Sequence, residues 1–86
     1  MYIIEKGVSK DFKEAFKWAK KAADQGNPRG AAYVGMMYFN GEGVATDKKE
    51  ALKWLQIAKN QNEDLDAKSA AINFLREHKD VFSKLN

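Results

Sequence analysis

The side chains that could do chemistry in this chain are few, and no group of them has the spacing of an active site. Gly41-x-Gly43 does not form a phosphate loop, because it follows a helical pattern, lacks a third glycine and leads into a short connector. His78 is the only histidine and cysteine is absent, which removes a thiolate metal site and a cysteine nucleophile. The sequence therefore predicts no enzyme activity, no metal and no cofactor.

Lysines are the other chemically capable group, and they gather in one segment. Residues 10–21 carry five of them, namely Lys10, Lys13, Lys17, Lys20 and Lys21. Such a face could attract phosphate, nucleic acid or an acidic protein. Gln56 and Ile57 stand in the second half where Lys20 and Lys21 stand in the first, so the lysine stripe is not continued. We expect a solvated face, and anion or nucleic-acid binding through residues 10–21 is the alternative function.

Composition indicates one small globular domain over residues 1–86. Of these residues 44% are hydrophobic and 31% charged, and the net charge is +3. Residues 1–36 hold seven Lys/Arg against four Asp/Glu, and residues 37–72 hold five against six, so nucleic acid is an improbable partner. Neither a signal peptide nor a membrane-spanning segment is visible, which leads us to expect a cytoplasmic protein.

The elements that position these residues are organised as a repeat. Shifting the chain by 36 positions lays Gly7-Val8 on Gly43-Val44, Asp11 on Asp47 and Trp18 on Trp54 without a gap. A fixed period of this size is typical of stacked helical units that act as binding scaffolds. The equivalent tryptophans are expected to pack between helices.

Cap residues and apolar periodicity predict where the helices lie. Asp11 followed by Glu14, and Asp47 followed by Glu50, have the spacing of a capping box, and Asn27-Pro28 is a further helix start. Apolar residues then recur at helical spacing. The predicted elements are a partial unit at 1–6, helices at 12–25, 28–40, 48–60 and 65–78, and a C-terminal cap at 79–86 formed by Val81, Phe82 and Leu85.

These residues resemble a known family. The resemblance rests on the series Ala22-Ala23, Gly26, Val34-Gly35, Tyr38, Gly41-x-Gly43-Val44, Asp47, Ala51, Trp54 and Ala58. It is similar to the Sel-one-like (Sel1-like) repeat, an α/α repeat related to the tetratricopeptide repeat. The resemblance implies an all-α right-handed superhelix whose first helices line a concave groove, and an adaptor function.

Helical geometry selects a candidate site within that arrangement. Arg29, Tyr33, Met36 and Asn40 fall on one side of the helix at 28–40, opposite the side expected to be core. One period later lie Leu65 and the further candidates Ser69, Ile72 and Arg76. Arg, Tyr and Met are enriched at protein interfaces. The sequence predicts that this stripe binds a partner protein or peptide; the alternative is that it packs within the chain or against a second copy. Incomplete repeats at the two ends also predict self-association, as a homodimer.

A remote alternative comes from the resemblance alone. Relatives of this repeat are credited with binding penicillin-type ligands, but those relatives are cysteine-rich and this chain has no cysteine.

Overall fold

The computed structural model describes residues 11–85, which form five α-helices and no strand. In chain order they are α1 (Phe12–Asp24), α2 (Pro28–Asn40), α3 (Lys48–Lys59), α4 (Leu65–Glu77) and the short α5 (Lys79–Ser83). The predicted all-α fold of about five helices is confirmed. The partial unit expected at residues 1–6 lies outside the described residues.

Side-chain caps begin the helices as their sequences predict. Asp11 accepts a hydrogen bond from the backbone N–H of Glu14, and Asp47 accepts one from Glu50, each at 3.1 Å. Asn27 caps α2 by accepting from two backbone N–H groups, with Pro28 at the first helical position. The predicted second hydrogen bond of the capping box, from the Asp47 backbone N–H to the Glu50 carboxylate, is wrong. Glu50 instead accepts from the Trp54 indole N–H at 3.3 Å, and the Asp47 N–H donates to the Tyr38 carbonyl oxygen.

Three helices end one residue earlier than the sequence predicts. α1, α3 and α4 stop at Asp24, Lys59 and Glu77, and the next residue in each case is the C-cap. A cap still donates its N–H to the helix although it has left helical geometry, so apolar periodicity alone does not separate it from the last helical residue. α2 ends as predicted, with Gly41 in the left-handed conformation at φ 71°.

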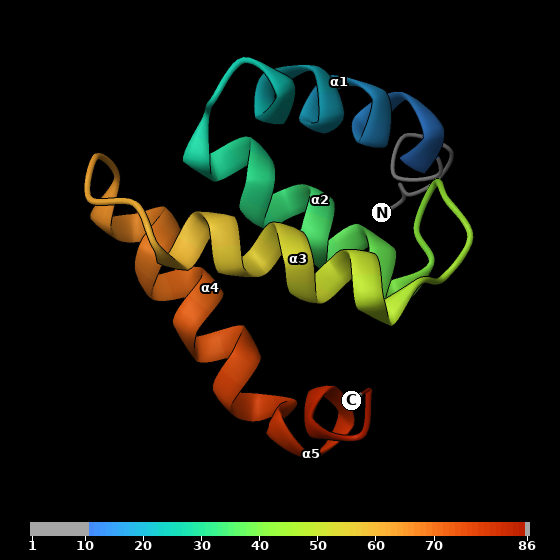
Figure 1. The fold of residues 1–86 in the computed structure, drawn as a ribbon. Helices are drawn as coiled ribbons and strands as arrows, with labels where there is room; N and C mark the ends of the chain where they lie inside the picture. Colours follow the sequence, from blue (N-terminus) through green and yellow to red (C-terminus); the bar gives the residue numbers. More distant parts are fainter. Residues whose placement is uncertain (1–10, 86) are drawn as a thin grey trace, which may run out of the picture.

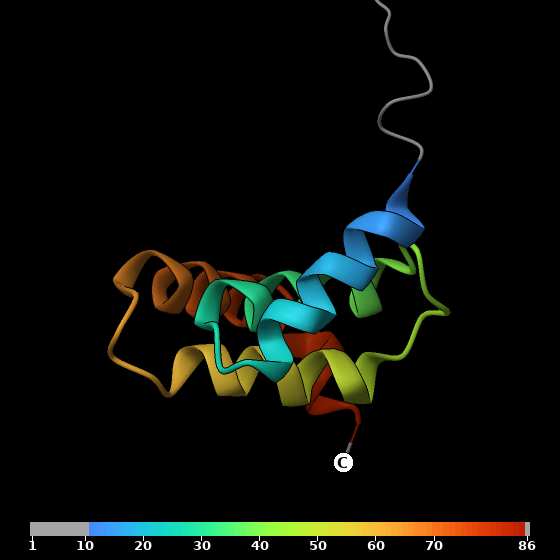
Figure 2. The same cartoon turned by 90° about the horizontal axis from the view of Figure 1, so that it is seen from above.

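The helices form a stack in which neighbours in sequence are neighbours in space. Figure 1 shows α2 and α3 between α1 at one end of the molecule and α4 with α5 at the other. α1 and α3 run in one direction, and α2 and α4 run in the opposite one. In the view from above, α1 lies in front of the other helices (Figure 2). One side of α1 therefore has no neighbouring helix among the described residues.

The core lies where α2 packs between α1 and α3. Val34, Ala51 and Leu55 are fully buried, as the small and apolar side of residues 28–40 predicts. Glycine permits the close approach. A Cβ added to Gly35 would lie 2.6 Å from Leu55 Cγ, and one added to Gly30 would lie 2.8 Å from the Ala22 Cβ. α2 therefore touches α1 and α3 with nearly bare backbone on two different sides.

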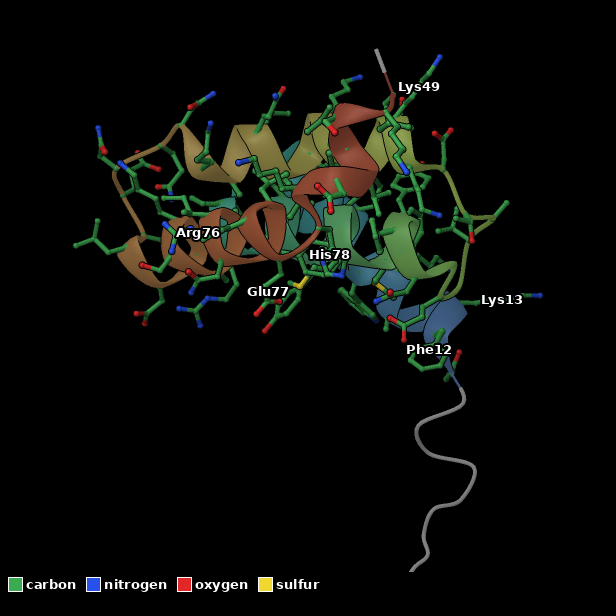
Figure 3. All side chains as sticks on the ribbon, turned by 90° about the horizontal axis from the view of Figure 1, so that it is seen from below. Phe12, Lys13, Lys49, Arg76, Glu77 and His78 are labelled. Atoms are coloured by element: carbon green, nitrogen blue, oxygen red, sulfur yellow. The ribbon has the colours of Figure 1, made fainter. Side chains whose placement is uncertain are left out.

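An aromatic cluster closes the end of the stack at α4 and α5. Phe82 is 6% exposed, and its ring lies 5.3 Å from that of Phe39, which also meets Phe74 edge-on at 5.1 Å. His78 stacks within 4.5 Å of both Phe39 and Phe74, at the end of α4 beside Arg76 and Glu77 (Figure 3). The predicted turn that covers the last apolar face is thus α5.

The prediction that Trp18 packs between helices is wrong. Trp18 is 65% exposed, and Phe12, at the start of α1 (Figure 3), is 41% exposed. Trp54, the repeat equivalent of Trp18, is half-buried. The two tryptophans differ because α3 has helices on both sides, whereas α2 covers only one side of α1.

Candidate partner-binding site

A shallow groove runs between α2 and α4. It has a volume of about 290 Å³ and is lined by Arg29, Ala32, Tyr33 and Met36 of α2 and by Asp66, Ala67 and Ala70 of α4. Tyr33 is 52% exposed, whereas Met36 is half-buried against the core. Three of the candidate residues, Arg29, Tyr33 and Met36, are thereby brought together. The other four line no part of this groove.

The side of α4 that faces the groove differs from the side that repeat equivalence selects. Asp66 and Ala70 line the groove, but Ser69, Ile72 and Arg76 do not. Successive residues of a helix turn by about 100°, so Ser69 and its companions lie on a neighbouring face of α4. Asn40, at the last position of α2, is exposed and lies beyond the groove. Asp66 and Ala70 could not be predicted from the sequence, because an aspartate and an alanine near a helix start carry no interface signal.

Arg29 is held by two carboxylates at the beginning of α4. Its guanidinium lies 3.3 Å from Asp64 and 4.0 Å from Asp66, whose side chains are 26% and 94% exposed. The 36-residue period could have indicated this pair. Arg29 is the repeat equivalent of Leu65, so it should lie one repeat away from the two residues that flank Leu65, Asp64 and Asp66. Because Arg29 is engaged with Asp64, the exposed Asp66 is the charge at the groove most accessible to a partner.

Asp64 should contribute more stability than Asp66. Its carboxylate caps α4 by accepting from the Ala67 N–H at 3.1 Å and also pairs with Arg29. We expect Asp64→Ala to lower the free energy of unfolding by about 1–2 kcal/mol, chiefly through the lost cap. Asp66→Ala, the matched control, should change it by less than about 0.5 kcal/mol. Urea unfolding followed by circular dichroism measures both, and equal losses would contradict the assigned roles.

Several lysines of α1 are engaged within the chain. Lys17 lies 4.0 Å from Glu14, and Lys20 lies 3.4 Å from Asp24. Lys20 and Lys21 also lie over the rings of Trp54 and Trp18, at 5.7 and 5.4 Å from the centroids. Lys10 is outside the described residues. These contacts are those of a solvated helix face, and they favour that interpretation of the lysines over anion binding.

Neither a metal cluster nor a membrane span is present in the described part of the chain. Among residues 11–85 no three His, Cys, Asp or Glu side chains are grouped closely enough to hold a metal ion. In the same residues, no helix has the length and apolar character needed to cross a bilayer. His78 Nδ1 lies 3.0 Å from the Phe74 carbonyl oxygen, and its ring packs in the aromatic cluster.

Comparison with known families agrees with the geometry. The family model described as Sel1 repeat matches residues 2–27 and residues 28–63, together more than half of the 86 residues. The second match spans α2 and α3, whereas the first contains α1 alone among the described helices. No curated protein and no solved structure was similar enough to be matched to the chain. Sel1 repeats are in general protein-interaction modules and typically non-catalytic scaffolds. The chain belongs to the Sel1 repeat family.

Proposed function

We propose that this protein is an adaptor that binds a segment of a partner protein in the groove between α2 and α4. The observation that carries the proposal is the lining of that groove, in which Tyr33 and Met36 face Ala67 and Ala70 across a volume of about 290 Å³. An aromatic ring and a thioether beside small residues suit an apolar side chain of a partner. The general role of the family supports the same conclusion.

The charges at the groove indicate what else the partner segment carries. Arg29 is paired with Asp64 at 3.3 Å, while Asp66 is 94% exposed and lies at 4.0 Å from the same guanidinium. A Lys or Arg of the partner would therefore bind beside Asp66. The proposed motif is one apolar side chain seated between Met36 and Ala70, with a basic residue toward the start of α4. Asn40, Ser69, Ile72 and Arg76 would contact only a partner that extends beyond the groove.

Filling the groove should abolish binding without disturbing the fold. Ala70 is exposed on α4 and lines the groove, so Ala70→Arg places a long side chain over Met36. We expect about tenfold less partner to be retained by the immobilised variant from native cell extract, as for the loss of a central contact. Met36→Ala should reduce retention about threefold for the same reason. Quantitative mass spectrometry of the retained proteins is the measurement.

Ser69→Arg is the matched control. Ser69 neighbours Ala70, is equally exposed and does not line the groove, so this variant should retain the partner as the unmodified protein does. Far-ultraviolet circular dichroism should be the same for all of these proteins. Retention that is lost in Ser69→Arg but unchanged in Ala70→Arg would place binding on the neighbouring face of α4.

A further inference from the structure

A second and larger groove lies on the adjoining side of α2, where α2 meets α1. Its volume is about 530 Å³, and the residues that form its apolar floor are Phe12, Ala15, Trp18 and Ala19 of α1 and Tyr33 and Met37 of α2. Three aromatic side chains are uncovered there, because Phe12 is 41%, Trp18 65% and Tyr33 52% exposed. A mostly apolar groove of this volume is within the range of clefts that bind ligands.

The internal repeat indicates which kind of structural element could bind in this groove. Ala15 and Ala19 of α1 have the counterparts Ala51 and Leu55 one period later on α3, and these pack against Gly35 of α2. Ala51 and Leu55 are completely buried there, whereas the equivalent Ala15 is exposed and Ala19 only half-buried. Because α3 packs against α2 through these positions, the equivalent positions of α1 form a surface against which another helix could pack. That helix would run parallel to α2, as α4 does on the other side (Figure 1).

One position of this α1 surface differs from its counterpart on α3, and the difference indicates which side chain a bound helix would carry there. Leu55 requires glycine opposite it, because a Cβ on Gly35 would lie 2.6 Å from Leu55 Cγ. The equivalent of Leu55 on α1 is Ala19, which lacks the branched end of the leucine side chain. The space that a leucine side chain would occupy at this position would be filled by a residue larger than glycine on the bound helix.

The charges around the groove complement an acidic helix start. Arg29, whose guanidinium also pairs with Asp64, lines the end of the groove near Asn27. Lys21 flanks Trp18 on the α1 side, together with Lys17 and its ion-pair partner Glu14. In the described part of the chain Lys21 makes no ion pair and lies over the Trp18 ring at 5.4 Å. Glu42 lines the opposite end. A helix parallel to α2 would place its first turn at the cations and its last turn at Glu42, which also matches the preference of helix dipoles for acids first and bases last.

We propose that the α1–α2 groove binds an amphipathic helix of a partner protein, parallel to α2, with an acidic first turn and a residue larger than glycine opposite Ala19. This surface adjoins the α2–α4 groove proposed above as the adaptor site. The two grooves share Arg29 and Tyr33, but Trp18 and Ala19 belong only to this one, and Met36 and Ala70 only to the other.

A synthetic helix built on α2 itself tests the proposal with the full chain. The probe is a fluorescent peptide of residues 27–40 carrying Arg29→Glu and Gly35→Leu, and a second probe retains Gly35. Fluorescence anisotropy should give a dissociation constant on the order of 100 μM for the leucine peptide. Ala19→Leu in the protein recreates the α3 surface, so it should weaken the leucine peptide about tenfold by overpacking and leave the glycine peptide nearly unchanged.

Two more variants keep the outcome decisive. Trp18→Ala alters an exposed side chain and should weaken the leucine peptide about fivefold while circular dichroism stays the same. Ala70→Leu, in the other groove, should not affect the peptide, and Ala19→Leu should not affect partner retention through the α2–α4 groove. The absence of binding at millimolar peptide, a loss common to Ala19→Leu and Ala70→Leu, or indifference to Trp18→Ala would overturn the proposal.

Two other occupants would also overturn it, and both are detected in the free protein. Trp54→Phe leaves Trp18 as the only tryptophan, so acrylamide quenching reports whether the groove is open. Slow quenching that Tyr2→Asp makes fast would assign the groove to the chain's own first residues. Slow quenching that becomes fast on dilution, with a dimeric mass in analytical ultracentrifugation, would assign it to a second copy. The expected result is fast quenching and a monomeric mass until the peptide is added.

Discussion

Replacing Gly43 with alanine should lower the free energy of unfolding by about 3 kcal/mol, a large part of the stability of so small a domain. The added Cβ would overlap the carbonyl oxygen of Phe12 and lie 2.6 Å from its carbonyl carbon. Both atoms belong to the backbone at the start of α1, so no change of side-chain rotamer relieves the overlap. The positive φ of 75° adds the strain that any residue with a Cβ meets in that region.

Gly26→Ala is the matched control for this experiment. Gly26 also has a positive φ, 88°, but nothing lies within 4 Å of its added Cβ. Its substitution should therefore cost about 1 kcal/mol from backbone strain alone. Thermal unfolding followed by circular dichroism should show the midpoint falling by about 15 °C for Gly43→Ala and about 5 °C for Gly26→Ala. Equal shifts would mean that the loop before α3 does not touch α1.

Leu55→Ala should be as damaging, for a different reason. Leu55 is completely buried at the centre of the stack, against Gly35 of α2. Truncating it removes three carbon atoms from a packed site that is closed on all sides, and we expect a loss of about 3–4 kcal/mol. Denaturant unfolding in urea measures the loss, with the midpoint moving at an unchanged slope if the denatured state is the same.

Leu65→Ala provides the same chemical change at the surface. Leu65 begins α4 and is 67% exposed, so its truncation should alter the free energy of unfolding by less than about 0.5 kcal/mol. A loss of similar size at Leu55 and Leu65 would contradict the position of the core between α2 and α3.

Local chemistry made much of the fold predictable. Asp11, Asp47 and Asn27 begin their helices because a side-chain oxygen within three residues of a free N–H satisfies it regardless of the rest of the molecule. Gly41 ends α2 because few other residues tolerate the left-handed conformation. These interactions span a few residues, so the sequence contains all of their partners.

The candidate site was less predictable because its composition depends on how helices lie against one another. Trp18 and Trp54 have the same place in the repeat, yet only Trp54 is covered, since burial requires a neighbouring helix as well as an apolar side chain. Asp66 and Ala70 enter the α2–α4 groove through the rotation of α4 about its axis. The caps of α4 fix where that helix begins, but only its packing against α2 and α3 sets this rotation.

The short helix α5 also limits how copies of this chain could associate with one another. It packs against α3 and α4 and buries Phe82 where a further helical layer would otherwise continue. Among the described residues the two ends of the stack are thus unlike, because α5 covers one end and no helix covers the outer side of α1 at the other. Head-to-tail growth into filaments needs complementary ends, and α5 covers the apolar face that such growth would use at one of them. Copies that met through their α1 faces would have to do so about a two-fold axis, and such a pair is closed to further addition.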